Sequence, residues 1–309
     1  MRKYYLIAVI LLLSNYLYAI KGVAGGAAPF LRSGVGGRAI SLSNAFTSFT
    51  DDSTVTYWNP AASAYLNKIA VSSMFSWLTE DRKYNFFNFL LPSDYGIFAL
   101  NFINFSIGNI EARQSDTQDF TLIEDVENAY FFTYGKELIR NLNGESVAAG
   151  LNIKVIQTSI DKYNSFGFSF DTGFIVAPFK FLTFGITLQD IYGNIQWSTG
   201  TVEKIPFDMK IGFLIKVLDD FFRLSMDFEK IEYEGLILRN GIEMNFFKML
   251  FTRAGISYDI KSYEFNYTFG AGIKYKIYDI IIQVDYAFAK EEFFNVFQPQ
   301  HKLSVNLYF

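Results

Sequence analysis

Apolar and polar residues alternate along most of the chain after residue 65. From Phe207 to Phe213 every second residue is apolar, and the same alternation runs through Phe222–Phe228 and Ile280–Phe288. Successive side chains of a β-strand point to opposite faces, so this period of two predicts strands with one apolar and one polar face. The final segment, His301–Phe309, follows the same pattern and ends on an aromatic side chain.

The pattern predicts about fourteen strands, an even number, as bacterial outer-membrane barrels have. The chain contains 35 Phe and 20 Tyr residues, yet after the amino terminus no stretch has the continuous apolar character of a spanning helix. Such a chain can cross a membrane as a closed barrel, in which every backbone group is paired. The predicted fold class is all-β, a 14-stranded antiparallel transmembrane β-barrel with strands at Ala64–Leu78, Tyr84–Leu91, Ile97–Ile110, Asn128–Leu138, Val147–Ile160, Ser165–Ala177, Phe181–Tyr192, Phe207–Leu218, Phe221–Ile231, Leu236–Phe247, Leu250–Asp259, Phe265–Ile277, Ile280–Ala289 and Lys302–Phe309.

The connections between these strands favour a barrel over a soluble sandwich. In a barrel with both ends in the periplasm, connections after odd-numbered strands face outside and are long, whereas the other turns are short. Long connections follow the third, seventh and thirteenth strands, at Glu111–Glu127, Gly193–Pro206 and Lys290–His301. The first four strands alternate less clearly, so the sequence leaves open which of their faces points inward.

Charged residues on the strands are predicted to point into the lumen, because each would cost about 2–4 kcal/mol at the lipid midplane. Both signs occur, which favours a wall of mutually paired charges over a ring that selects a substrate. Tyrosines near strand ends are predicted to form the aromatic girdles of the membrane interfaces. The predicted lumen charges are Lys210, Lys216, Arg223, Asp227, Glu229, Arg239, Glu243, Arg253, Lys274 and Asp285, and the predicted girdle residues are Tyr84, Tyr192, Tyr233, Tyr258, Tyr263, Tyr275 and Tyr278.

The amino terminus predicts export from the cytoplasm. The basic start Met1–Lys3 precedes the apolar run Tyr4–Leu13, which has the length of a signal-peptide core and is too short for a membrane anchor. We expect cleavage after Ala19, which makes residues 1–19 a signal peptide and places the mature chain in the bacterial outer membrane. The aromatic Phe309 at the other end is similar to the signal that the barrel-assembly machinery reads.

Composition excludes several classes of function. The chain has 27 basic and 31 acidic residues and no basic tract, so nucleic acid is not an expected partner. It has no cysteine and therefore no disulfide or thiol chemistry. No metal-ligand spacing or cofactor motif occurs, and the one histidine, His301, falls on the opposite strand face from Ser304, so no catalytic dyad is expected.

Residues 20–63 have a different character and precede the barrel at 64–309. Asn59 can cap a short helix that begins at Pro60, and Asp51-Asp52-Ser53 predicts a turn or a second cap. Fourteen strands enclose a bore that wall side chains cannot fill. A compact segment with aromatic residues is a natural plug for that bore, whereas a flexible periplasmic tail is usually poor in aromatics. We therefore predict an N-terminal plug, or hatch, inside the lumen.

The motifs of this segment resemble the hatch of the FadL superfamily of outer-membrane transporters, and their spacing is most similar to the PorV/PorQ-like branch. The resemblance implies a barrel with an amino-terminal hatch, whose matching residues hold the hatch fold. They are Gly37, Arg38, Ala39, Asp51, Asp52, Asn59, Pro60 and Ala61. The candidate ligand-binding residues are the aromatic side chains of the same segment, Phe30, Phe46, Phe49 and Trp58.

Two functions follow from the resemblance. FadL-type members bind hydrophobic compounds such as fatty acids near the hatch and release them sideways through a gap in the wall. PorV-type members instead serve protein secretion or surface assembly, with secretion-system proteins as partners. We expect passive transport of hydrophobic compounds, with membrane lipids as surroundings. Strand glycines that could allow an inward kink of the wall are Gly108, Gly150, Gly173 and Gly212. An open general porin fits poorly with a packed hatch.

Overall fold

The computed structural model describes residues 26–78, 81–113, 119–141, 144–293 and 296–309. The expected signal peptide lies outside these residues. Within them the chain forms fifteen strands, one of which, β8, has only three residues, so fourteen strands build the wall. The strands are β1 (Ala70–Trp77), β2 (Arg82–Ser93), β3 (Gly96–Ala112), β4 (Thr121–Arg140), β5 (Ser146–Ile160), β6 (Tyr163–Phe179), β7 (Leu182–Trp197), β8 (Val202–Lys204), β9 (Asp208–Val217), β10 (Phe222–Ile231), β11 (Leu236–Phe246), β12 (Leu250–Asp259), β13 (Phe265–Ile277), β14 (Ile280–Phe293) and β15 (Val296–Tyr308).

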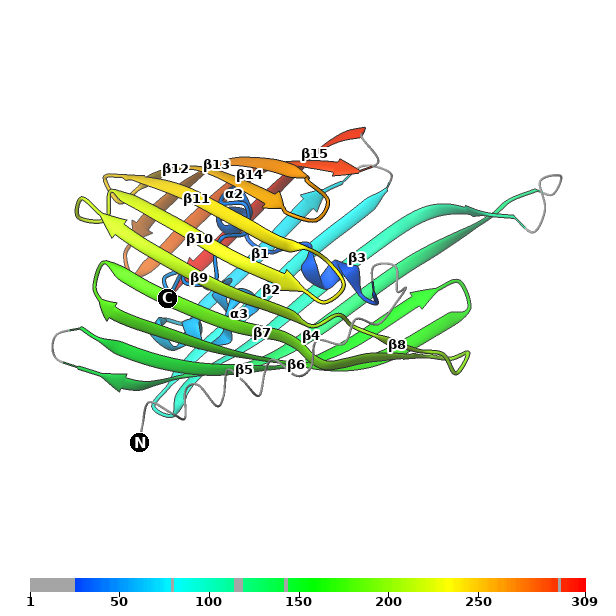
Figure 1. Ribbon diagram of the computed structural model, residues 1–309, viewed down its shortest axis with the longest axis horizontal. Coiled ribbons are helices and arrows are strands. Elements are labelled where there is room, and N and C mark those ends of the chain that lie inside the picture. The colour runs from blue at the N-terminus through cyan, green and yellow to red at the C-terminus, as the bar shows by residue number, and fades with distance from the viewer. Residues whose placement is uncertain (1–25, 79–80, 114–118, 142–143, 294–295) are drawn as a thin grey trace.

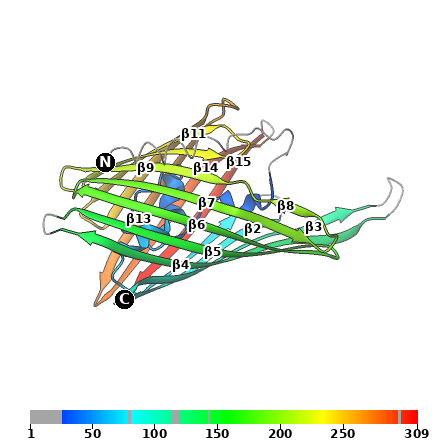
Figure 2. The ribbon, with the colours of Figure 1, turned by 60° about the horizontal axis from the view of Figure 1, so that its bottom comes forward.

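The sheet closes on itself, which confirms the predicted 14-stranded antiparallel β-barrel (Figures 1 and 2). Each strand of the wall pairs with its sequence neighbours, and β15 returns to pair with β1 from Ala70↔Tyr308 to Trp77↔His301. Closure leaves no strand edge with unpaired backbone groups, as a wall in lipid requires. The barrel end at which β3 turns into β4 is called the loop end below, and Ala70 and Tyr308 lie at the other end.

Several strand boundaries differ from the prediction. The first strand begins at Ala70 and not at Ala64, because Pro60–Tyr65 forms a 3₁₀ helix, η3. The predicted connections Glu111–Glu127 and Lys290–His301 are largely strand, since β4 begins at Thr121 and the β14–β15 hairpin continues to Phe293 and Val296. Beyond the membrane both faces of a hairpin can be polar. Alternation therefore fades there while the backbone ladder continues.

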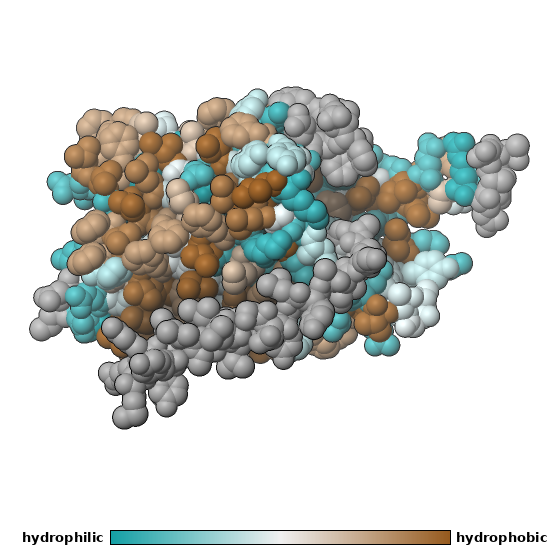
Figure 3. Space-filling model, in the orientation of Figure 1, coloured by the Kyte–Doolittle hydropathy of each residue, from teal (hydrophilic) through white to brown (hydrophobic). Residues whose placement is uncertain are grey.

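The predicted facing of the charged side chains is confirmed. Lys210, Asp227, Glu243, Arg253 and Asp285 are buried inside the barrel, as are other members of the set. Large apolar side chains of the strands point outward, and Figure 3 shows apolar residues over the middle of the visible wall with polar residues toward its ends. The inner wall therefore carries the charge and the outer wall presents apolar surface to lipid.

The prediction for one tyrosine is wrong. Tyr84 is predicted to lie in an interface girdle, but it points into the barrel and is 1 % exposed, whereas Tyr192, Tyr263 and Tyr278 are exposed. The reason lies in the first strands, whose inner face is itself partly apolar and includes Met74. When both faces carry apolar residues, a period of two no longer tells inside from outside.

Among the described residues no helix is long and apolar enough to span a membrane.

Candidate functional site

The described residues before β1 lie inside the barrel. Residues 26–66, called the inner segment below, contain η2 (Pro29–Arg32), α2 (Gly37–Ser41), α3 (Val55–Trp58) and η3, which Figure 1 shows enclosed by the strands. The rings of Phe46 and Phe49 stack with centroids 4.3 Å apart, and Trp58 meets Phe46 edge-on at 6.2 Å. A buried aromatic cluster therefore fills the bore at this level.

Helix α2 lies directly against the wall because its first residue is glycine. The Gly37 N–H donates to Ser304 Oγ at 2.9 Å, and a Cβ atom at Gly37 would lie 2.7 Å from the carbonyl oxygen of Asp285. The next residue, Arg38, is buried and meets Glu243 at two points, with Nε–Oε2 at 2.9 Å and Nη2–Oε1 at 2.8 Å. This fork-to-carboxylate contact fixes the orientation of α2 on the wall.

The acidic pair of the inner segment joins the same group of charges. Arg38 lies 3.1 Å from Asp51 and 3.6 Å from Asp52, and Arg223 of β10 lies 2.6 Å from Asp51. Burial alone would raise the pKa of Asp51, but the guanidinium groups of Arg223 and Arg38 outweigh it and hold that pKa well below its usual range. Asp51 therefore stays ionised and bridges the inner segment to the wall.

Arg253 of β12 extends this network along the wall. It lies 2.5 Å from Glu243 and 2.7 Å from Asp285, and Gln283 donates to Asp285 at 2.7 Å. Each of these charged groups is buried and has an opposite charge within contact distance. These lumen charges thus pair with one another and with the inner segment, as the pattern of mixed signs predicts, whereas Asp227 accepts from the N–H groups of Phe46 and Thr47.

A second group of charges centres on Lys210 of β9. Its ammonium lies 3.0 Å from Asp208 and 3.2 Å from Glu229, and it donates to Gln189 Oε1 at 2.9 Å. The same ammonium lies 5.3 Å from the centre of the Trp58 ring. This cation–π contact holds the aromatic cluster of the inner segment against β9.

Asn59 has the capping role that its sequence position predicts, and it also binds other parts of the chain. Its side-chain oxygen accepts from the Ala61 N–H at 3.1 Å at the start of η3. Its amide nitrogen donates to the carbonyl of Thr47 at 3.0 Å. The Asn59 side chain sits over Gly173 of β6, where a Cβ atom would lie 2.0 Å from Asn59 Oδ1. One residue therefore ties two turns of the inner segment to the wall.

A hydroxyl and amide chain holds α3 on the opposite side of the barrel from Arg38. Thr56 Oγ1 donates to Asn101 Oδ1 at 2.6 Å, and Asn88 Nδ2 donates to the same oxygen at 2.7 Å. Asn101 in turn donates to Thr133 Oγ1 at 3.0 Å. These groups are uncharged and buried, and the hydrogen bonds among them involve no charged partner.

A belt of glycines runs around the inner wall where the inner segment touches it. At each of these positions an added Cβ atom would come within 3 Å of an atom of the inner segment. Three of the four glycines named as possible kinks, Gly150, Gly173 and Gly212, belong to this belt, whereas Gly108 faces open space. The belt therefore seats the inner segment, and it consists of Gly135, Gly150, Gly173, Gly185, Gly212, Gly241, Gly255 and Gly270.

The inner segment also bounds a cavity of about 360 Å³ at the loop end of the barrel. Phe30 of η2 forms one wall, and Tyr84 and Phe105, which lie opposite each other on β2 and β3, form another. Apolar and polar or charged side chains contribute about equally to the lining, so the cavity could contact both an apolar body and a polar group of a ligand. The remaining lining residues are Pro29, Arg32, Ser33, Leu78, Arg82, Glu127, Gln300 and Lys302.

The structure separates the four aromatic candidates. Phe30 lines the loop-end cavity, whereas Phe46, Phe49 and Trp58 pack against one another in the filled bore. The motif residues likewise fall in two places, since Arg38, Asp51 and Asp52 meet at β10–β12 while Asn59, Pro60 and Ala61 lie on β5 and β6. Sequence analysis missed Tyr84 and Phe105 as cavity residues, because only the facing of β2 and β3 identifies them.

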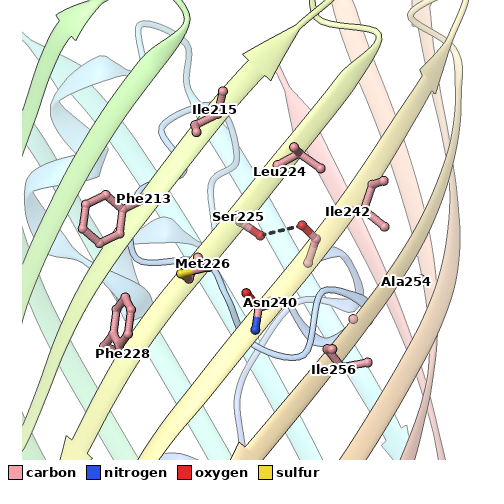
Figure 4. A pocket seen from close by; sticks show the side chains of 12 residues that line it. Phe213, Ile215, Leu224, Ser225, Met226, Phe228, Asn240, Ile242, Ala254 and Ile256 are labelled. Atoms are coloured by element: carbon pink, nitrogen blue, oxygen red, sulfur yellow. Dashed lines mark hydrogen bonds between the residues drawn. The ribbon is translucent and has the colours of Figure 1, made fainter.

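A larger depression of about 750 Å³ lies on the outer face of β9–β12 (Figure 4). Its rim is apolar and includes Leu224 and Met226, which are exposed, while Asn240 lies among them. Behind it, Ser225 Oγ donates to the Gly241 carbonyl at 3.4 Å. The strands β9 to β12 pair without a register shift, so this part of the wall is continuous.

The wall is less regular between β6 and β7. Their pairing changes register between Phe168 and Thr172 of β6, opposite Leu188–Asn194 of β7. Asp190 and Tyr192 adopt positive φ angles of 57° and 54°. Local backbone conformations of this kind interrupt the regular ladder of hydrogen bonds. The two strands stay paired on both sides of this interruption of the ladder, which is called the β6–β7 discontinuity below.

No family model matches the chain, and no curated protein matches it. Solved structures do match it in fold. The toluene transporter TodX of P. putida aligns with a TM-score of 0.65 at 10 % sequence identity, covering 89 % of this chain and 97 % of TodX. The monoaromatic hydrocarbon channel CymD aligns with a TM-score of 0.63 at 11 % identity over 89 % of this chain and 97 % of CymD.

A FadL homologue of Pseudomonas aeruginosa also aligns, with a TM-score of 0.52 at 11 % identity, over 88 % of this chain and 97 % of that chain. At such low identity these alignments establish the shared barrel fold and not a shared ligand. The chain thus has the fold of FadL-like barrels over most of its length.

Proposed function

We propose that this protein passively transports hydrophobic compounds, aromatic or fatty-acid-like, across the bacterial outer membrane. The observation that carries the proposal is the loop-end cavity beside the filled bore, whose lining combines the apolar Phe30, Leu78 and Phe105 with charged side chains. The proteins of similar fold described as transporters or channels for toluene and monoaromatic hydrocarbons support this substrate class. The apolar outer wall supports the location.

In this proposal the inner segment is the hatch, and its motif residues hold it in place. Gly37 and Arg38 secure α2 to β15 and β11, Asp51 ties the segment to β10, and Asn59 secures η3 to β6. A compound bound in the loop-end cavity is kept from passing straight through by the aromatic cluster around Trp58. Transport therefore requires either a movement of the hatch or an exit through the wall.

We further propose that release is lateral, at the β6–β7 discontinuity. A ladder of outward-facing amide side chains crosses β2, β3 and β4 at Asn85, Asn104 and Asn128, and Asn104 donates to Asn128 at 2.9 Å. This ladder marks the level at which the apolar outer wall gives way to polar surface. The discontinuity begins two residues further along β6, at Phe168, on the apolar side of that boundary. An opening there would lead into the outer leaflet.

Uptake measurements test transport directly. Cells without another hydrophobic channel would take up radiolabelled toluene faster when they produce this barrel, and equal uptake with and without it would contradict the proposal. Hatch movement can be tested in the cysteine-free background with Ser53→Cys and Ser72→Cys, because the two hydroxyl groups are hydrogen-bonded across the segment and β1. The oxidised pair should slow uptake and a reductant should restore it, whereas unchanged uptake would show that the hatch need not move.

Lateral release has a matched pair of cross-links. Phe170→Cys with Ile191→Cys would join the facing residues of β6 and β7 at the discontinuity. Leu224→Cys with Ile242→Cys would join facing residues of β10 and β11 in the continuous wall. We expect only the first oxidised pair to reduce uptake. Equal effects of the two pairs would argue against an exit between β6 and β7.

A second function, in protein secretion or surface assembly, is favoured by one observation. The β3–β4 hairpin is built from strands of 17 and 20 residues and projects from the loop end in Figure 1. It exposes Phe120 and Leu122, which could contact a partner protein. Shortening this hairpin by two residue pairs would abolish binding of such a partner but leave toluene uptake unchanged, and the opposite result would favour transport alone.

A further inference from the structure

The amide ladder of β2–β4 continues across β5–β7 on the outer face of the barrel. Each member lies directly opposite the next on the neighbouring strand, so the side chains form one line, called the amide row below. The row contains five amide side chains and one aromatic ring. Its members are Asn85, Asn104, Asn128, Gln157, Phe166 and Gln196.

The two halves of the amide row differ in their hydrogen bonds. Asn85 donates to Asn104 at 3.5 Å, and Asn104 donates to Asn128 at 2.9 Å. Gln157 and Gln196 are exposed and form no side-chain hydrogen bond with another residue that the structure describes. A primary amide both donates and accepts hydrogen bonds. The two glutamines therefore present donors and acceptors to a molecule outside the barrel.

These glutamines border a depression of about 640 Å³ on the outer face of β4–β7, a volume within the range of ligand sites. None of its described lining residues is charged, and most carry an amide or a hydroxyl group. The Phe166 ring lies between Gln157 and Gln196 and is 44 % exposed. A phosphate or carboxylate finds no counter-charge here. A sugar matches the depression, because its hydroxyl groups donate and accept as amides do and its ring can pack on Phe166.

The position of the depression indicates where such a sugar comes from. The wall next to the amide row is apolar, with Phe168 and Tyr130 exposed on its outer face. Lipid headgroups lie at the level where an apolar barrel wall gives way to polar surface. A molecule seated in the depression can therefore place a polar headgroup on the amide row and an apolar chain on the wall beside it.

We propose that this depression binds the uncharged sugar headgroup of a glycolipid in the leaflet at the loop end. Gln157 and Gln196 bond the sugar hydroxyl groups, Phe166 packs against the sugar ring, and the acyl chains lie along Phe168 and Tyr130. The site lies outside the bore, so it does not depend on the proposed transport function.

Native mass spectrometry of the detergent-solubilised barrel tests this site by counting bound lipid molecules. The probes are digalactosyl diacylglycerol, whose headgroup is two uncharged hexoses, and phosphatidylglycerol with the same acyl chains, whose headgroup is anionic. The barrel should bind the glycolipid more tightly. Gln157→Ala combined with Gln196→Ala should weaken glycolipid binding by about tenfold, since two neutral hydrogen bonds are lost, and leave phosphatidylglycerol binding unchanged.

Asn85→Ala is the matched control, because it removes an outward amide of the same row that lies outside the depression. It should leave the binding of both lipids unchanged. Unchanged phosphatidylglycerol binding by the double variant also shows that the variant barrel is folded. Equal binding of the two lipids by the unsubstituted barrel, or tighter binding of phosphatidylglycerol, would overturn the proposal. An equal loss of glycolipid binding in Asn85→Ala would do the same, because the depression would then not be the site.

Discussion

The inner segment meets the two sides of the barrel by different chemistry. On the side formed by β9–β14, ion pairs join Arg38 to Glu243 and Asp51 to Arg223, and Lys210 contacts the Trp58 ring. On the side formed by β2–β7, Asn59, Thr56 and Asn101 hold it through uncharged groups and close backbone contact. The β6–β7 discontinuity and Tyr84 lie on this second side, where Lys154, Asp171 and Asp190 form buried ion pairs within the wall and not with the inner segment.

This difference indicates which side of the inner segment is fixed and which side can yield. Separating a buried ion pair leaves charge without a partner, whereas a small displacement that breaks an amide hydrogen bond costs far less free energy. We therefore expect the segment to stay attached to β9–β14 while its contacts with β2–β7 change during transport. The following predictions test that comparison.

Removing Arg38 should have the largest effect. Arg38→Met leaves Glu243 and Asp52 buried with fewer opposite charges, so the free energy of unfolding should fall by about 3–5 kcal/mol in a urea titration of the vesicle-embedded barrel. Arg113→Met is the control, because the Arg113–Glu111 pair is exposed at the loop end and should contribute less than about 1 kcal/mol. Equal effects would mean that the ion pairs do not anchor the segment.

Crowding the glycine belt on the β2–β7 side should have a smaller effect. In Gly173→Ala the new methyl group would overlap Asn59 Oδ1, so the segment must shift and the free energy of unfolding should fall by about 1–3 kcal/mol. Gly108→Ala is the matched control, because a Cβ atom there has open space around it. Thermal shift of the two variants measures the difference, and an unchanged melting temperature in Gly173→Ala would contradict the close contact.

Loss of the Asn59 side chain should cost about 1–2 kcal/mol. Asn59→Ala removes the cap of η3 and the hydrogen bond to Thr47, whereas Asn59→Asp keeps the capping oxygen but turns a buried carboxylate oxygen toward the Thr47 carbonyl. Urea unfolding at pH 7 should therefore rank the two variants with aspartate as the less stable. The reverse order would show that the cap matters more than the donor to Thr47.

The smallest effect concerns Asp51 and pH. Its pKa is lower in the folded chain than in the unfolded chain, so its stabilisation is present above the unfolded pKa and is lost as pH falls through the folded value. Because the side chain is 36 % exposed, Asp51→Asn should lower the free energy of unfolding at pH 7 by less than about 1 kcal/mol. The difference from the unsubstituted chain should shrink below about pH 4. A difference that grows on acidification would have the wrong sign.

The strands and the facing of β9–β15 could be predicted from the sequence because lipid and lumen impose a strict period of two there. The same rule failed at Tyr84, where the inner segment makes the lumen face apolar. It also failed at Thr121 and Phe293, where the hairpins continue as strands beyond the predicted boundaries. The Asn59 cap is local and was predictable, whereas its contact with Gly173 joins residues distant in sequence.

The glycine belt has a consequence for biogenesis. The wall glycines have no side chains, so the inner segment alone fills the space beside them. Thr47 does so at Gly185, and Leu42 does so at Gly255. If the barrel closed first, the inner segment would have to enter a bore whose inner surface already matches its folded shape. Barrel closure and packing of the segment are therefore best achieved in one step, in which the segment docks while β1 and β15 are still unpaired.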